Sequence, residues 1–362
     1  MARLDAVDAI ENVFTVYREA GLRWLDGRDL YPAEFHFNYF PPSAVLFTGW
    51  GGLSFEVGGA LWRIVNLGVF AFGVWRLSRC GDPAGSSKRF LIATVVTVVL
   101  SASAARYGQM TLAMAGMMMA AVAYAESGAL WRAAVCAALA VALKPLAVVL
   151  LLLLFVLYPR LSWRMAVALT AFFLLPFLFQ HADYVWRQYE AVPAMLATRA
   201  RPQYDWQQNI FGLLDKLGWT VSGAQKTIVS GASALLVLLL CWRARRRAPA
   251  IGVELSIYAL AACYILLLGS GTERNTYGLL APVVGLLAAR AWSVRDRGLL
   301  QLVSAVILID LLSHTLQRAY PQTVLAMVKP IAGLIVLAWL AWTTLRVPPE
   351  TSKLAAPPGT SP

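Results

Sequence analysis

The sequence predicts an all-α membrane protein, a polytopic helical bundle of roughly ten spans. Hydrophobic residues make up 59% of the 362 residues, charged residues only 14%, and the mean hydropathy is +0.63. A soluble domain usually carries about 25% charged residues. The apolar residues also come in long blocks rather than in a stripe with a ~3.6-residue period, so the helices are apolar all round and need lipid as their solvent.

The predicted bundle is made of apolar blocks, some of which are shorter than the ~20 residues of a straight span. They lie at about 55–77, 90–105, 109–126, 130–143, 145–158, 165–180, 228–242, 251–268, 276–290, 299–314 and 324–345. The two blocks within 130–158 are consistent with one bent helix pair that meets at Lys144-Pro145, because proline ends or kinks a helix.

Basic and acidic residues are sorted between the two sides of this bundle. The basic clusters lie at 76–89, 160–164, 243–247 and 290–297, with Arg346 and Lys353 in the tail. The positive-inside rule makes their side cytoplasmic, so the net charge of +12 reflects topology and does not indicate nucleic-acid binding. The opposite side receives His36, His181, His314 and most of the carboxylates. These groups are either gathered for acid–base chemistry or merely tolerated in outward loops.

The chain divides into three parts. Residues 1–40 form a non-cytoplasmic N-terminal segment with interfacial helices, and 41–345 form the transmembrane domain, with an outward loop at about 181–227. Residues 346–362 are rich in Pro, Ser and Thr and form a disordered cytoplasmic tail. The segment 42–53 is apolar but too short to span, so it lies in the interface or dips back as a re-entrant helix.

We expect a multi-pass protein of the cell (inner or plasma) membrane. Residues 1–40 lack the apolar core of a signal peptide. Either the following helix carries a short N-terminus across the bilayer, or the protein begins upstream with a further helix. We favour the second interpretation, because nothing in the given chain precedes the N-terminal segment to translocate it.

Neither a cofactor nor a metal is expected. The four cysteines, Cys80, Cys136, Cys241 and Cys263, have no CxxC or metal-ligand spacing and are interpreted as packing residues. The sequence has no Ser/His/Asp order, no HExxH motif, no Walker-type loop and no GxGxxG. Soluble nucleotide chemistry is therefore unsupported.

Lys144 is the sharpest candidate for a substrate-binding residue. It lies in an apolar block directly before Pro145, and an ionisable residue inside the apolar region is a functional candidate by default. A buried ammonium needs an anion, and a lipid phosphate at the membrane boundary would serve. The alternative is a lysine that snorkels from a helix end to the interface.

Two aromatic segments on the outward side carry further binding candidates. Tyr107 and Gln109 lie in a tight turn between two apolar helices, and the Gln109 amide offers the donors and the acceptor that a sugar hydroxyl needs. A plain turn explains Gly108 equally well. Tyr39 marks the entry of the chain into the membrane, where an aromatic residue also serves as an interfacial anchor.

The polar loop 269–277 carries the catalytic candidate Glu273. A carboxylate at the membrane boundary suits general-base work. Arg274 beside it is a candidate for binding phosphate, and Asn275 for binding the substrate. The alternative is an ordinary solvated loop.

Several segments agree in order and spacing with a known family over about residues 20–285. They are GLRWLDGRDLY (21–31), FHFNYFPPSAVLF (35–47), GGALWRIVNL (58–67), RYGQMTLAMAGMMMAAVAYAESG (106–128), AALAVALKPLAVVLLLL (137–153) and GTERNTYGLLAP (271–282). Together they resemble glycosyltransferase family 87, a group of polyprenyl-phosphate-sugar-dependent membrane enzymes that includes bacterial mannosyltransferases. The resemblance implies a GT-C type fold with its active site in the first outward loops.

The resemblance also implies residue roles and exposes one departure. Tyr39 falls in the aromatic-proline entry, Gln109 in the glycine-glutamine turn and Lys144 at the lipid-phosphate contact. Such enzymes usually place an aspartate, their general base, just before the tyrosine of the first outward segment, and Val13 stands there in this chain. Glu11, Asp8 or Glu273 would have to act as the catalytic carboxylate instead.

The predicted function is hexosyl transfer in the cell envelope. A mannose-like sugar would move from a polyprenyl-phosphate donor to a lipid or glycan acceptor on the non-cytoplasmic face, with membrane lipids as the surroundings and no nucleic-acid partner. One alternative is a transporter or flippase of a lipid-linked or anionic substrate, which would require broken helices in two related halves. The other is an inactive scaffold homologue, which the missing aspartate would suit.

Overall fold

The computed structural model describes residues 13–80, 86–199, 207–247, 249, 251–320 and 323–346, and within these the ordered elements are helices without any strand. The α-helices are α2 (Phe14–Leu25), α3 (Pro41–Phe47), α4 (Phe55–Ser78), α5 (Ser86–Arg106), α6 (Thr111–Glu126), α7 (Leu130–Leu143), α8 (Val148–Leu157), α9 (Pro159–Leu174), α10 (Ala182–Arg199), α11 (Ile210–Lys216), α12 (Gly223–Arg247), α13 (Val253–Leu268), α14 (Ala281–Val294), α15 (Arg297–Ala319) and α16 (Lys329–Arg346). The predicted all-α fold is confirmed. Asp8 and Glu11 lie outside the described residues.

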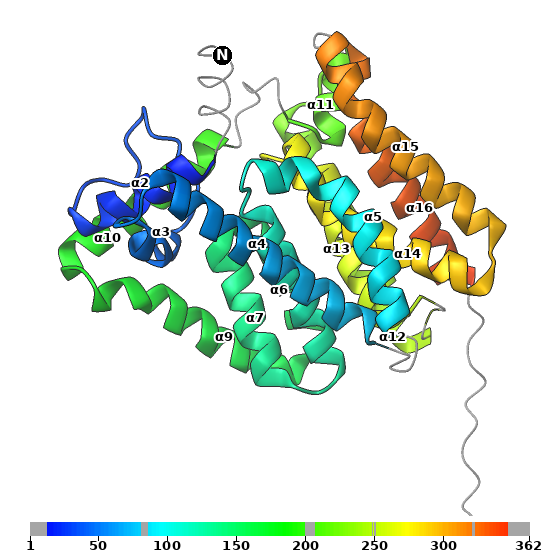
Figure 1. Ribbon diagram of the computed structural model, residues 1–362, viewed down its shortest axis with the longest axis horizontal. Helices are drawn as coiled ribbons and strands as arrows, with labels where there is room; N and C mark the ends of the chain where they lie inside the picture. The colour runs from blue at the N-terminus through cyan, green and yellow to red at the C-terminus, as the bar shows by residue number, and fades with distance from the viewer. Residues whose placement is uncertain are drawn as a thin grey trace, which may run out of the picture.

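The helices form a bundle with fully buried members at its centre (Figure 1). Along α13 every residue from Leu255 to Cys263 is buried, and α6 is buried along almost its whole length. The surrounding helices expose large apolar side chains, such as Ile64 on α4, Leu91 on α5 and Leu239 on α12. A helix that is apolar on its outer face as well is stable only in a nonpolar solvent, so these faces meet lipid.

Small residues allow the closest helix crossing, between α4 and α6. A Cβ atom added at Gly73 would lie 2.5 Å from the Gly116 oxygen, and one added at Gly116 would lie 2.2 Å from the Val69 oxygen. No side chain fits at such distances, so the two backbones touch directly, as is typical of membrane helices that pack through glycine.

Six helical segments of the described chain are long and apolar enough to cross a membrane. They are Phe55–Ser78, Ser87–Arg106, Pro159–Leu178, Gly223–Arg247, Arg274–Val294 and Arg297–Ala319, and Thr111–Glu126, Leu130–Leu143, Pro145–Leu157 and Val253–Leu268 are shorter apolar helices. The break between α7 and α8 lies at Lys144, which is extended (φ −151°, ψ 127°) and precedes Pro145. The predicted bend between these two helices therefore occurs at Lys144-Pro145.

Arginines join helix ends at the end of the bundle where the sequence puts its basic clusters. The Arg245 guanidinium on α12 lies 3.3 Å from the Glu126 carboxylate at the end of α6. Arg243 donates a hydrogen bond of 3.0 Å to the Thr344 carbonyl near the end of α16. The ends of α6, α12 and α16 thus meet on one side of the bundle, which the sequence predicts to be cytoplasmic.

The other end of the bundle carries short helices and irregular segments. In Figure 1, α2, α3 and α10 lie together at one side, opposite α15 and α16. The predicted outward loop at about 181–227 contains two helices, α10 and α11, and α12 begins within it at Gly223. The segment 42–53 forms α3 and a single 3₁₀ turn, and it packs under α2 rather than crossing the bundle.

Candidate functional site

A pocket of about 690 Å³ opens where the N-terminal segment, the 107–110 turn, α10 and the 271–275 loop meet. It is lined by Val13, Val16, Tyr31, Pro32, Ala33, Phe35, His36, Phe37, Asn38, Tyr39, Gln109, Ala191, Ala194, Met195, Thr198 and Glu273. Three residues that the sequence places far apart and predicts to act together, Tyr39, Gln109 and Glu273, line this one pocket. Pockets that combine aromatic walls with a few polar groups are typical ligand sites.

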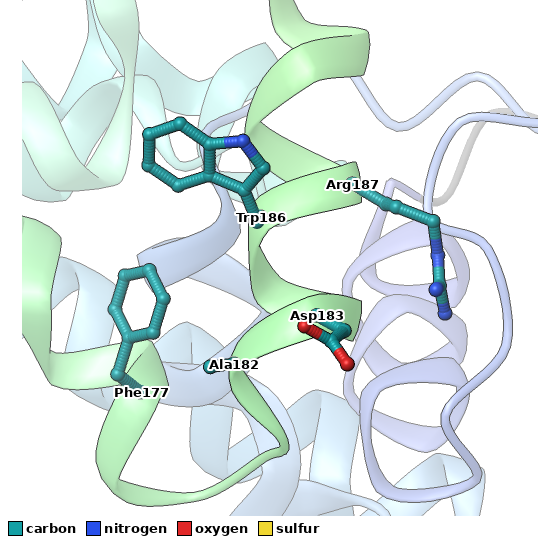
Figure 2. A pocket seen from close by; sticks show the side chains of 5 residues that line it. All are labelled: Phe177, Ala182, Asp183, Trp186 and Arg187. Atoms are coloured by element: carbon teal, nitrogen blue, oxygen red, sulfur yellow. The ribbon is translucent and has the colours of Figure 1, made fainter.

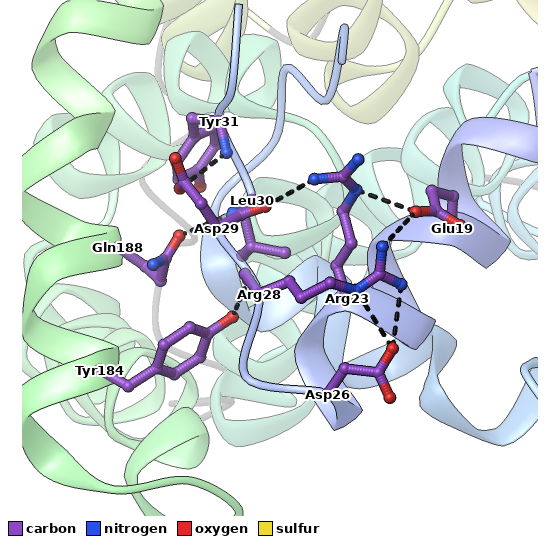
Figure 3. Close-up of polar contacts among 9 residues, drawn as sticks. All are labelled: Glu19, Arg23, Asp26, Arg28, Asp29, Leu30, Tyr31, Tyr184 and Gln188. Carbon is purple, nitrogen blue, oxygen red and sulfur yellow. Dashed lines mark hydrogen bonds and ion pairs between the residues drawn. The ribbon is translucent and has the colours of Figure 1, made fainter. Parts of the chain in front are cut away.

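The irregular 26–40 segment forms one wall and is held by side chains of α10 (Figure 3). The Leu30 backbone N–H donates to the Gln188 side-chain oxygen at 2.9 Å, and the Tyr184 hydroxyl donates to the Arg28 carbonyl at 2.7 Å. Backbone groups outside regular structure must find such partners when they are buried. These bonds fix the wall, whereas the exposed ion pairs around Glu19 in the same view contribute little stability.

Tyr39, which lines the pocket, packs against a cluster of buried aromatic rings around Tyr17. The Tyr17 hydroxyl lies 3.1 Å from the Tyr39 hydroxyl and accepts a 3.1 Å hydrogen bond from the Met110 N–H. The Tyr17 ring stacks on Phe47 at 4.9 Å and meets Trp62 edge-on at 5.9 Å. Burial, with the neighbouring Tyr39, raises the pKa of Tyr17 well above its usual value, so the phenol keeps its proton and remains a hydrogen-bond donor.

Side chains of α4 hold the 107–110 turn in place through hydrogen bonds to its backbone. Gly108 has a φ of +64°, which favours glycine, and its carbonyl accepts a 2.7 Å hydrogen bond from the Trp62 indole. The Asn66 side chain donates to the Gln109 carbonyl at 2.8 Å and accepts from the Ala113 N–H at 2.7 Å. Asn66 therefore ties the turn to the first residues of α6, and Gln109, only 5% exposed, presents its amide to the pocket.

Glu273 is oriented by the 3₁₀ helix that follows it, η4 (Arg274–Leu279). Its carboxylate accepts a hydrogen bond from the Thr276 backbone N–H, while its own N–H donates to the Thr276 hydroxyl at 3.1 Å. This capping box holds the side chain in one place. Among the described residues that line the pocket, Glu273 is the only carboxylate.

Val13 also lines the pocket, at the position where the family resemblance implies an aspartate. Its N–H donates to the Tyr107 carbonyl at 3.2 Å, which fixes it beside the 107–110 turn. The expected place for a general base is thus at the pocket, but it holds an isopropyl group that cannot take a proton. Glu273 therefore remains the carboxylate among the described residues that line the pocket.

Four predicted binding residues do not line this pocket. Lys144 is only 1% exposed, and its ammonium donates to the Thr111 hydroxyl at 2.9 Å. The Arg274 guanidinium donates to the Gln317 oxygen of α15 at 3.1 Å. The remaining two are Asn275, which accepts a 2.7 Å hydrogen bond from the Ser103 hydroxyl, and Tyr107, which is buried beside the Arg106 guanidinium.

A buried ion pair beside the Glu273 loop was not anticipated from the sequence. The Lys329 ammonium lies 2.8 Å from the Asp310 carboxylate and 3.4 Å from the Arg274 carbonyl. Lys329 is 3% exposed, so its charge is stabilised by this partner rather than by water. Asp310 within an apolar block was the available signal, because a carboxylate there needs a partner.

A second hollow, of about 470 Å³, lies outside the pocket at the corner before α10 (Figure 2). The Phe177 and Trp186 rings project on one side of α10, and the Asp183 and Arg187 side chains on the other. Trp186 is 60% exposed. Such an arrangement is typical of a helix at the level of the lipid headgroups, as the aromatic and charged composition of 181–227 predicts.

Comparison with known proteins identifies the family. The model of "Glycosyltransferase family 87" matches residues 37–271. The chain belongs to glycosyltransferase family 87. The family suggested by the sequence motifs is therefore confirmed, and this family 87 protein is a multi-pass membrane glycosyltransferase by membership. The matched range includes Tyr39, Gln109 and Lys144, whereas Val13 and Glu273 lie outside it.

Two further comparisons complete this result. No curated protein matches the chain. Among solved structures, the family 87 protein is similar to ArnT from Cupriavidus metallidurans, whose crystal structure has undecaprenyl phosphate bound. The identity is 14% and the TM-score 0.46, over 95% of this chain and 77% of that one.

Proposed function

We propose that this family 87 protein transfers a mannose-like hexose from a polyprenyl-phosphate carrier to a lipid or glycan acceptor on the non-cytoplasmic face of the cell membrane. The main observation in support is a single pocket lined by Tyr39, Gln109 and Glu273, at the end of the bundle away from the basic clusters. Family membership supports glycosyl transfer, and the apolar bundle suits a donor whose tail stays in lipid.

Glu273 is the proposed general base. It takes the proton of an acceptor hydroxyl while that oxygen forms a bond to the anomeric carbon of the donor sugar. The bond from that carbon to the phosphate oxygen breaks, and the polyprenyl phosphate leaves with the electron pair. One displacement of this kind inverts the anomeric configuration. Asp8 and Glu11, which lie outside the described residues, are the alternative bases.

The pocket supplies complementary groups for the sugar. The Gln109 amide offers donors and an acceptor, and the Tyr39 hydroxyl lies beside the protonated Tyr17 hydroxyl at 3.1 Å. The Gln109 backbone is held by Asn66 of α4, and the Tyr39 hydroxyl lies against Tyr17 of α2. Groups that are held before substrate arrives lose little entropy when they bind it.

Lys144 is the proposed source of positive charge for the leaving phosphate. Its ammonium does not line the pocket but bonds to the Thr111 hydroxyl, next in the chain to Met110, whose N–H donates to the Tyr17 hydroxyl. The Lys144 ammonium would stabilise the negative charge that develops on the leaving phosphate near the Tyr17 and Tyr39 hydroxyls, since a charge acts strongly where the surroundings have a low dielectric constant. Arg274, Asn275 and Tyr107 would position the Glu273 loop and the 107–110 turn.

Glu273→Gln tests the proposed base. We expect sugar transfer from a radiolabelled polyprenyl-phosphate sugar in membranes to fall at least ~100-fold, because general-base catalysis is lost while the amide oxygen can still accept the Thr276 bond. Glu34→Gln is the matched control, because Glu34 is exposed and does not line the pocket. Equal transfer by both variants would remove the role of Glu273.

The intact chain decides between the proposal and its rivals. Transfer by the wild type in membranes, with any polyprenyl-phosphate hexose, supports the enzyme. Absence of transfer together with movement of the labelled donor across vesicles would favour a transporter or flippase. Absence of both would favour an inactive scaffold homologue, in agreement with Val13 at the position of the expected aspartate.

A further inference from the structure

A groove runs between α8 and α12 toward the basic end of the bundle. Its upper part, which lies farther from that end, has a volume of about 250 Å³, is apolar and is lined by residues that include Leu152, Val156, Gly231, Ala234 and Leu238. Its lower part, about 610 Å³, shares Val156 and Leu238 with the upper part and adds Leu157, Pro159, Leu239, Trp242, Arg245 and Arg246. The groove is therefore continuous and changes from apolar to cationic along its length.

Short side chains on α12 keep the apolar part open. A Cβ atom added at Gly231 would meet nothing within 4 Å, and Ala234 lies one turn further along the same groove. From Gly231 to Arg246 the helix rises about 22 Å at ~1.5 Å per residue. That length exceeds the ~15 Å of one hydrocarbon leaflet, so the groove reaches from the leaflet interior to its headgroups.

Two guanidinium groups are held at the lower end of the groove. Arg245 lies over the Tyr158 ring at 4.0 Å, and Arg246 lies over the Trp242 ring at 4.5 Å. Arg245 also pairs with Glu126 at 3.3 Å, whereas no carboxylate of the described chain lies within ion-pair distance of Arg246. Trp242 is 49% exposed, as expected of an aromatic residue at the headgroup level.

We propose that this groove binds an anionic phospholipid. One acyl chain lies along Gly231, Ala234 and Val156, and the headgroup phosphate meets the Arg246 guanidinium, with Arg245 beside it. A guanidinium matches phosphate through paired N–H donors, and its position over an aromatic ring fixes its direction. The site is separate from the proposed donor site, because the Glu273 pocket lies at the other end of the bundle.

Charge decides the occupant. The cytoplasmic leaflet is rich in anionic lipids, which attract arginines that lie near its surface. The polyprenyl-phosphate donor must instead present its phosphate where the sugar can reach Glu273. The groove is thus assigned to a lipid of the surrounding bilayer rather than to the substrate or the product of the reaction.

Lipid binding to the purified full-length chain tests this assignment. The probes are phosphatidylglycerol and phosphatidylcholine with identical acyl chains, and bound lipid is counted by native mass spectrometry from detergent. We expect the wild type to bind phosphatidylglycerol about tenfold more tightly, and Arg246→Gln to lose most of that preference. Arg346→Gln is the control, because Arg346 also lies over a ring, that of Trp342 at 4.0 Å, but lines neither part of the groove.

A second variant tests the acyl chain alone. Gly231→Leu fills the groove and should reduce binding of both lipids at least fivefold, whereas Gly68→Leu on α4 should not. Both glycines are exposed within a helix, and a Cβ at either would meet nothing within 4 Å, so both variants should fold. A thermal melt of each variant verifies this, and Ala234→Leu replaces Gly231→Leu if the latter unfolds.

Four results would overturn the assignment. The first is equal phosphatidylglycerol binding by Arg246→Gln and Arg346→Gln, and the second is binding unchanged by the groove-filling variant. The third is displacement of phosphatidylglycerol by an equimolar amount of a polyprenyl phosphate, which would make the groove a carrier site. Competition by glycerol phosphate at the same concentration as the lipid would likewise show that the acyl chain contributes nothing.

Discussion

The two ends of the bundle differ in what some of their polar side chains contact. At the pocket end, Trp62, Asn66 and Gln188 bond to backbone groups of irregular segments. At the basic end, arginines such as Arg246 and Arg346 lie over exposed aromatic rings, 4.5 Å from Trp242 and 4.0 Å from Trp342. The first kind of bond fixes the shape of a pocket, whereas the second keeps charge available at a surface. Polar side chains therefore fix the structure where they bond to irregular backbone, whereas an arginine over an exposed ring remains accessible at the surface.

Asn66 gives the largest expected effect on stability. Asn66→Leu removes both bonds of a fully buried side chain and leaves the Gln109 carbonyl and the Ala113 N–H to find other partners. Each unsatisfied buried group costs about 1–3 kcal/mol, so with two such groups thermal melts should show a loss of roughly 2–6 kcal/mol, and sugar transfer should fall. Arg346→Gln is the control, since the Arg346 side chain bonds to no segment of the pocket. A fall of under ~0.5 kcal/mol for Asn66→Leu would contradict the view that the pocket end is held by such bonds.

Val13→Asp is expected to increase activity. It places a second carboxylate on the pocket wall, at the position where the family resemblance implies the general base. In a chain that also carries Glu273→Gln, sugar transfer should recover about tenfold or more, because a proton acceptor is restored. Val16→Asp is the matched control, because Val16 also lines the pocket, and it should not restore sugar transfer. Equal recovery by both variants would mean that the position of Val13 has no special role.

Tyr17→Phe should have an intermediate effect that depends on pH. Because the pKa of Tyr17 is raised in the folded chain, the unfolded chain loses the phenol proton at lower pH than the folded chain does. Above the ordinary pKa of 10.0 the folded chain therefore binds more protons than the unfolded chain. The free energy of unfolding should therefore fall above pH ~10, and less steeply in Tyr17→Phe. At neutral pH the lost hydroxyl should cost about 1–2 kcal/mol, because the Met110 N–H loses its acceptor. An identical pH slope in both proteins would exclude a role for the Tyr17 proton.

Arg346→Gln is expected to change stability least, by less than ~0.5 kcal/mol. Its guanidinium rests on an exposed ring at the headgroup level, where water and lipid can replace the contact. Thermal melts at low and high salt measure the difference, and the small effect should shrink further with salt. A loss as large as that of Asn66→Leu would remove the distinction between the two ends.

Much of the fold follows from composition alone, because lipid requires long apolar helices with their backbone groups bonded internally. The predicted blocks 55–77 and 130–143 differ from α4 and α7 by at most one residue, and the bend at Lys144-Pro145 lies where the proline forces it. The helix α10 was predicted only as part of a loop. Its mixed composition hid the helical spacing of Tyr184 and Gln188, whose partners lie far away in the 26–40 segment.

The sequence by itself determined that this chain is a helical membrane protein with sorted charges, since the solvent around a helix acts on every residue locally. It also marked Tyr39, Gln109 and Glu273 as candidates. Only the tertiary structure decided that these three line one pocket, that Lys144 lies behind Thr111 and that Val13 occupies a wall of the site. These facts depend on which turns meet at the end of the bundle, and contacts between segments far apart in the chain are set by packing rather than by local sequence.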